Sequence, residues 1–187
     1  MPRGMKRAND QLTGGSNDVN PQEFVIVGVQ SGNDVTTVIQ QPLPIPRLPT
    51  RQGYNLVIEV LSVQFYWTNG LVPVAGTAQT IVFNLTTNPN AISTVIGHLS
   101  DPRSIARWFA QSALLGGGTA TPFQVENDAR FDLTDQAGHG ILLATDNVFL
   151  QLGSATTGQA NQAVCRFQYR WKEVTLTEYI GIVQSQQ

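Results

Sequence analysis

The sequence predicts an all-β sandwich, on two observations. The first is a series of roughly eight to ten short strand-like segments separated by turn residues, with no alternation of strands and helices. The second is the stretch from Cys165 to Lys172, where apolar and polar side chains alternate with the period of a half-buried strand. One face of that strand is aromatic, and the other carries cations. The number and order of segments favour a sandwich or jelly roll over a barrel.

The composition indicates a chain that can bury a core but keeps few charges on its surface. Apolar residues make up 41% of the 187 residues and charged residues only 13%, about half the usual share. Between Gln52 and Ser100 the only formal charge is Glu59. Because a soluble monomer normally keeps surface charge to avoid association, we predict self-assembly. The alternative is an ordinary sandwich whose surface is polar through Thr and Gln.

We predict two parts along the chain, a flexible and weakly basic arm over residues 1–22 and one folded domain over residues 23–187. The arm carries Arg3, Lys6 and Arg7 and has almost no apolar content, so it cannot order itself by burial. It is either an arm that contacts nucleic acid phosphates or an ordinary disordered terminus.

Strands are predicted over residues 24–29, 35–41, 54–67, 79–86, 122–126, 129–133, 139–144, 147–152 and 162–183. Prolines between residues 42 and 49 favour a stiff, extended connection across a surface. One inserted α-helix is predicted near residues 101–115. Ser100 or Asp101 could cap it, Pro102 suits its first turn, and the glycines at 116–118 would end it.

No catalytic constellation is present in the sequence, so we do not predict an enzyme, a cofactor or a resident metal. There is no nucleophile elbow, phosphate loop or dinucleotide fingerprint. Two histidines and the single Cys165, expected to be buried, cannot form a zinc site of standard spacing. No apolar run long enough to span a membrane occurs. One group of acidic residues could hold calcium between subunits, form an acid/base pair or simply be solvated: Glu126, Asp128, Asp132 and Asp135.

The cations on the polar face of the closing strand are candidates for binding nucleic acid, since arginine supplies both charge and donors to phosphate. They are Arg166, Arg170 and Lys172, which join Arg3, Lys6 and Arg7 of the arm as candidate nucleic-acid-binding residues. The alternative is that they pair with Glu173, Glu178 or acids of a neighbouring subunit. The net charge of −2 argues against a protein that coats nucleic acid over its whole surface.

Two stretches, FQYRWKEVTLTEYIGIVQSQQ at the end of the chain and GILLATDNVFLQLGS before it, resemble the capsid proteins of small circular single-stranded DNA (CRESS-DNA-type) viruses. The shell domain of that family is similar to that of small icosahedral RNA plant viruses. The resemblance implies a single jelly roll of two four-stranded antiparallel sheets, closed as identical subunits into an icosahedral shell around the genome. It also implies a basic arm that faces inward, although three cations are few for such an arm.

These expectations combine into a viral capsid protein of the virion that self-assembles around a single-stranded DNA genome. Contacts to the nucleic acid are expected to be independent of sequence, and the sequence does not identify a host-cell receptor. The alternative function is a lectin-like jelly roll that binds a carbohydrate through Trp67, Tyr66 or loop acids.

Overall fold

The computed structural model describes residues 21–29, 37–45, 52–67, 78–89, 101, 103–113, 128–155 and 162–186. Within these ranges the chain forms nine strands and one helix. They are β1 (Gln22–Val29), β2 (Thr37–Pro42), β3 (Tyr54–Trp67), β4 (Ala78–Thr86), β5 (Ser104–Ala113), β6 (Asp128–Asp132), β7 (Ile141–Leu143), β8 (Asn147–Ala155), β9 (Gln162–Thr175) and α1 (Leu176–Ser185).

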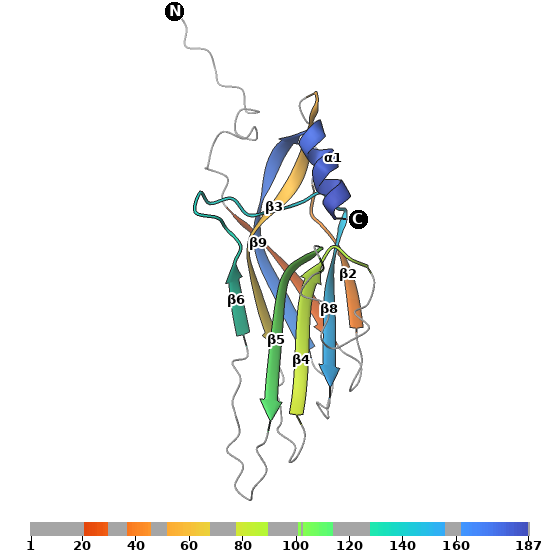
Figure 1. The fold of residues 1–187 in the computed structure, drawn as a ribbon, viewed down its shortest axis with the longest axis vertical. Coiled ribbons are helices and arrows are strands. Elements are labelled where there is room, and N and C mark those ends of the chain that lie inside the picture. Colours follow the sequence, from red (N-terminus) through yellow and green to blue (C-terminus); the bar gives the residue numbers. More distant parts are fainter. Residues whose placement is uncertain are drawn as a thin grey trace, which may run out of the picture.

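The strands form two antiparallel sheets that face each other as a sandwich (Figure 1). The first sheet has the order β1-β9-β3-β6, and β7 also pairs with β3; the second has the order β2-β8-β4-β5. Because β6 lies opposite residues 62–66 of β3 and β7 opposite residues 58–60, the two short strands share the fourth position of the first sheet. The chain thus crosses repeatedly between two sheets, each four strands wide. This confirms the predicted jelly roll.

The core lies between the sheets and is rich in aromatic side chains. Trp67, at the end of β3, stacks on Trp108 of β5 with ring centroids 4.2 Å apart, and both stack on Phe83 of β4. From β9 the alternating residues Cys165 and Phe167 are buried in the same core. The apolar face predicted for this strand is therefore a core face, as its period of two indicated.

The predicted helix near residues 101–115 is wrong, because Ser104–Ala113 is strand β5. It pairs along almost its whole length with β4, so that Ala106, Trp108 and Ala110 point into the core opposite Leu85, Phe83 and Ile81. Short apolar runs fit a helix and a strand almost equally well in sequence. Pairing with β4 decides between them here.

The helix lies instead at the end of the chain, where residues 162–183 were predicted as one strand. Strand β9 ends at Thr175, whose side-chain oxygen accepts a hydrogen bond from the backbone N–H of Glu178 and caps α1. The helix packs beside β3 and β9 at one end of the molecule (Figure 1). Its residues Tyr179, Ile182 and Val183 cover a second small core formed by Val57, Ala144 and Val174.

The other strand predictions are confirmed to within a few residues, apart from residues 122–126, which lie outside the described residues. The proline-rich connection begins against the first sheet, since the indole N–H of Trp171 donates to the carbonyl oxygen of Pro44 at 3.1 Å. Residues 1–20 are also outside the described ranges, so the arm over residues 1–22 stays a prediction.

Candidate contact face on the first sheet

The predicted cations of β9 lie on the face of the first sheet that points away from the core, which we call the outer face. Strand register places side chains from four strands on it: Glu23, Val25 and Val27 of β1; Val164, Arg166, Gln168, Arg170 and Lys172 of β9; Glu59, Ser62, Gln64 and Tyr66 of β3; and Asp128, Arg130 and Asp132 of β6. The cations of β9 are therefore joined by Arg130 and by four carboxylates on neighbouring strands. On these four strands the outer face is balanced in charge rather than cationic.

Glu59 is the centre of a cluster of charged groups on this face. Its side chain is fully buried, and its carboxylate accepts hydrogen bonds from Nε of Arg170 and from the backbone N–H of Gly140 at 3.1 Å. Nζ of Lys172 lies 3.5 Å from the same carboxylate. Burial alone would raise the pKa of Glu59, but these bonds and the two positive charges outweigh it and hold the pKa below its ordinary value.

The loop between β6 and β7 closes over the Glu59 carboxylate. A side chain at Gly140 would collide with the carbonyl oxygen of Val60, so glycine lets the backbone N–H approach Glu59. The guanidinium of Arg170 also donates to the carbonyl oxygen of Gly138 at 3.0 Å. Arg170 and Lys172 thus share one anion within the chain, rather than pairing with Glu173 or Glu178.

Arg166 differs from the other two predicted cations of β9 because its side chain is exposed. It lies in one row with Gln64 of β3 and Arg130 of β6. The amide of Gln64 donates to the carboxylate of Asp128 at 3.1 Å. The predicted arm residues Arg3, Lys6 and Arg7 lie outside the described residues.

Two of the acidic residues considered for calcium, Asp132 and Asp135, are engaged in local turns. Asp132 accepts from the hydroxyl of Thr134 at 2.7 Å, and Asp135 accepts from the backbone N–H groups of Ala137 and His139 at 2.9 and 2.8 Å. These bonds lower the pKa of both carboxyls. Among the described residues no group of three or more His, Cys, Asp or Glu side chains is placed to hold a metal. Glu126 lies outside them.

The two aromatic residues considered for sugar binding have different surroundings. Trp67 is fully buried in the core, so it cannot stack on a sugar at the surface, and that part of the alternative is wrong. Tyr66 points to the outer face and is 44% exposed. Cys165 is buried as predicted, and burial raises the pKa of its thiol.

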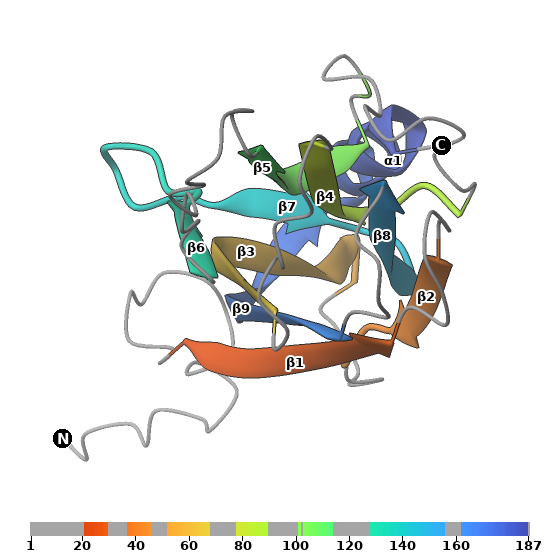
Figure 2. The ribbon, with the colours of Figure 1, turned by 90° about the horizontal axis from the view of Figure 1, so that it is seen from below.

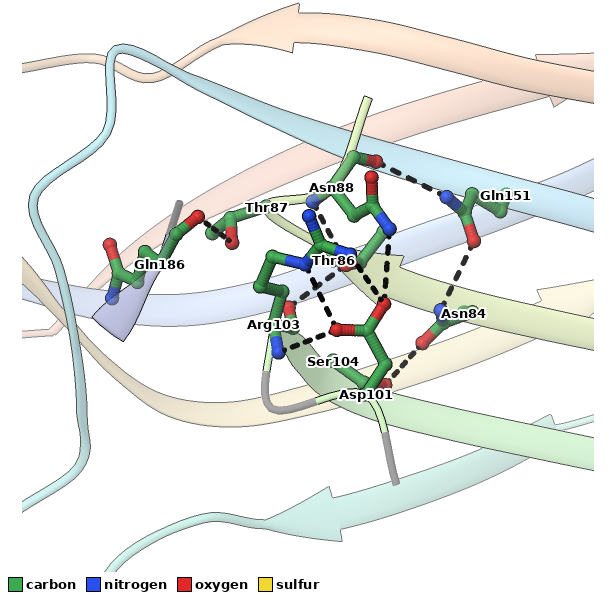
Figure 3. A network of polar contacts seen from close by, with 9 residues as sticks. All are labelled: Asn84, Thr86, Thr87, Asn88, Asp101, Arg103, Ser104, Gln151 and Gln186. Carbon is green, nitrogen blue, oxygen red and sulfur yellow. Dashed lines mark hydrogen bonds and ion pairs between the residues drawn. The ribbon is translucent and has the colours of Figure 1, made fainter. Parts of the chain in front are cut away.

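A second polar cluster lies at one end of the second sheet (Figure 3). The Asp101 carboxylate accepts from the amide of Asn88 and from the backbone and guanidinium N–H groups of Arg103, each at 3.0 Å. Although burial opposes it, this bonding lowers the pKa of Asp101. Gln151 of β8 then links Asn84 of β4 to the carbonyl oxygen of Asn88.

The same cluster reaches the end of the chain through Gln186. Its backbone carbonyl oxygen accepts from the hydroxyl of Thr87 at 3.4 Å. Its side-chain amide donates to the carbonyl oxygen of Leu142 at 2.6 Å and accepts from the N–H of Ala144 at 3.1 Å. These bonds tie the end of α1 to β7 and to the end of β4, which is a structural role.

Sequence reasoning missed Glu59 and Arg130 as members of this face. The signal for Glu59 was present, since it is the single charge in a long apolar strand, and a lone buried charge requires partners. For Arg130 there was no such signal, because only the pairing of β6 with β3 brings it beside the cations of β9.

Within the described part of the chain, no helix has the length and apolar character needed to cross a membrane. No protein-family model matches the chain, and no curated protein sequence matches it.

Several solved structures are similar to the chain at low sequence identity. Merkel cell polyomavirus VP1 in complex with disialyllactose has 11% identity and a TM-score of 0.49, covering 86% of this chain and 97% of that one. VP1 of Trichodysplasia spinulosa-associated polyomavirus with GM1 oligosaccharide has 10% identity and a TM-score of 0.48, with the same coverage. The Merkel cell polyomavirus virus-like particle has 12% identity and a TM-score of 0.47, covering 94% of this chain and 81% of that one.

Proposed function

We propose that this chain is the subunit of a viral capsid and that identical copies assemble into a closed icosahedral shell around a single-stranded DNA genome. The observation that carries the proposal is that Glu59 is buried and ion-paired. It is the only formal charge between residues 52 and 100, and it is buried and neutralised by Arg170 and Lys172. Strands β3 and β4 therefore offer no exposed charge to solvent.

A surface of that kind supports self-association. Exposed charge keeps proteins soluble and apart, and its absence over two central strands weakens that repulsion. The jelly roll supports the proposal because it presents two sheets and loops at both ends, which identical copies can bury by closed symmetric association. Fold alone does not specify function. The sequence resemblance to capsid proteins of circular single-stranded DNA viruses supplies the biological setting, the virion.

We further propose that the genome is held without sequence preference by the arm residues Arg3, Lys6 and Arg7, assisted by the cations of β9. Arg170 and Lys172 share a single carboxylate, so their cluster keeps one net positive charge, and Arg166 is exposed further along the same face of β9. Contacts of arginine and lysine to phosphate oxygens carry no sequence information. The affinity for nucleic acid falls as salt is added, and the steepness of that fall measures how many phosphate contacts are made.

Electron microscopy of the purified protein, with light scattering across salt and pH, tests the assembly. Closed particles of uniform size are expected. A protein that stays monomeric under all conditions contradicts the capsid function. The ratio of absorbance at 260 nm to that at 280 nm tests the genome separately, because uniform particles free of nucleic acid would keep the shell and reject packaging by this chain.

A further inference from the structure

We propose that strand β1 (Gln22–Val29) is a self-association edge, where it pairs antiparallel with β1 of a second copy about a two-fold axis at Val25. The inference rests on the proposed shell function and identifies one of its contacts. Strand β1 is the outermost strand of the first sheet (Figure 2). An edge strand presents unpaired backbone N–H and C=O groups, so it is a ready template for another strand.

The other sheet edges are each protected by devices that discourage such pairing. Strand β6 is short and has three exposed charged residues among its five. The edge of β7 is occupied by the Gln186 side chain, which bonds Leu142 and Ala144. Strand β2 ends in Pro42, and β5 carries Arg107 in its middle. Charges, proline and covering groups are the usual means of blocking edge-to-edge contact.

Strand β1 carries little of this protection. It contains no proline, lysine or arginine, and its single charge, Glu23, lies near one end. Among the described residues, no backbone hydrogen bond outside the ladder with β9 reaches it. Two β-branched side chains on its outer face, Val25 and Val27, are 46% and 51% exposed. Val27 continues across the sheet in one row with Val164 and the exposed Tyr66, which extends the apolar surface.

A second copy fits this edge in one register without a conflict of charge. Pairing about Val25 sets Val25 opposite its own mate and Glu23 opposite Val27 of the second copy. The two Glu23 residues are then about 14 Å apart, whereas Arg166 of the second copy, which flanks Val25 there, is about 12 Å from Glu23. The two Val25 side chains meet directly and each Val27 lies diagonal to Val25 of the other copy, so the four valines form a diagonal apolar strip, and the two Glu23 side chains lie beside it and apart from each other.

Disulfide trapping tests the register directly. In a Cys165→Ala background, Val25→Cys places the two new thiols on directly opposed residues, about 4.5–5.5 Å apart between Cα atoms, within disulfide range. Val27→Cys is the matched control, because it is equally exposed but faces Glu23 of the second copy. Under mild oxidation we expect assembled Val25→Cys protein to run as a covalent dimer on a non-reducing gel and Val27→Cys protein to stay a monomer. Equal cross-linking of the two variants, or none in Val25→Cys, overturns the proposal.

A second variant separates this contact from the shell itself. Val25→Lys sets two like charges opposite each other, so we expect two-fold association measured by sedimentation to weaken by about tenfold or more. Ile180→Lys, an equally exposed aliphatic site on α1, should associate like the wild type. If the wild type assembles and Val25→Lys assembles equally well, only the β1 contact is rejected. If the wild type stays monomeric, both proposals are rejected.

Discussion

Glu59 of β3 lies directly opposite Arg170 of β9, and the two form an ion pair on the outer face of the first sheet. The Glu59 side chain is fully buried, while the Arg170 side chain is 23% exposed. Lys172 and the N–H of Gly140 complete its bonding. The lone charge of an otherwise uncharged stretch is thus paired inside the subunit. It offsets part of the positive charge on the polar face of β9.

Replacing Glu59 by Gln should destabilise the protein, because two cations would then lie beside a neutral amide in a largely dehydrated site. We expect a loss of about 1–3 kcal/mol in the free energy of unfolding, below the range for fully buried pairs because both cations are partly exposed. Urea denaturation measures it. Glu23→Gln, the same change at an exposed site on β1, should alter stability by less than about 0.5 kcal/mol. Equal losses of stability in Glu59→Gln and Glu23→Gln would contradict the assignment of Glu59 as a buried, ion-paired carboxylate.

The stability of the wild type should fall in acid partly through Glu59. Its pKa is lowered in the folded state from an ordinary value of 4.5, so the folded state binds this proton less readily than the unfolded state. The contribution is complete above pH 4.5 and is lost as the pH falls through the lowered pKa. The difference in unfolding free energy between wild type and Glu59→Gln should therefore be constant near neutral pH and shrink below about pH 4.5. Urea titrations at a series of pH values check it, and a constant difference down to pH 2.5 would reject it.

Gln186→Ala should loosen the end of α1 from β7. The amide satisfies both the carbonyl oxygen of Leu142 and the N–H of Ala144, and its removal should cost about 1–3 kcal/mol. Hydrogen exchange gives the local readout, since the Ala144 amide should lose protection. Gln184→Ala, on the same helix but exposed, serves as the control. Unchanged protection of Ala144 in Gln186→Ala would show that the contact is dispensable.

Thr175→Ala should remove the cap of α1. Its hydroxyl oxygen accepts from the N–H of Glu178 at 3.3 Å, and such caps contribute about 1 kcal/mol. We expect a lower thermal midpoint together with faster amide exchange in the first turn of α1. Thr177→Ala, two residues further along and also exposed, should leave both nearly unchanged. A larger effect of Thr177→Ala than of Thr175→Ala would show that the helix is not capped by Thr175.

The alternation along β9 predicted its core face and polar face correctly, because a strand displays its two faces directly in the order of its residues. The same approach failed for Ser104–Ala113, where Ile105, Trp108 and Phe109 fit the spacing of a helix. It also missed α1, although Thr175 and Glu178 form the T-x-x-E pattern of a capping box. Local patterns compete when a segment is short, and pairing with β4 or packing on Val57 resolves the competition.

By itself, the sequence determined the all-β class, most strand positions, the buried face of β9 and the scarcity of charge. These features depend on periodicity and composition, which are properties of residues close together in the sequence. Only the tertiary structure decided the helix position, the partners of Glu59, and the balance of charge on the outer face. Those depend on which strands lie side by side: β6 brings Arg130, Asp128 and Asp132, and β3 brings Glu59, to a face on which the charges of β9 alone are all positive. Electrostatic interactions act across strands, and residues far apart in sequence set them.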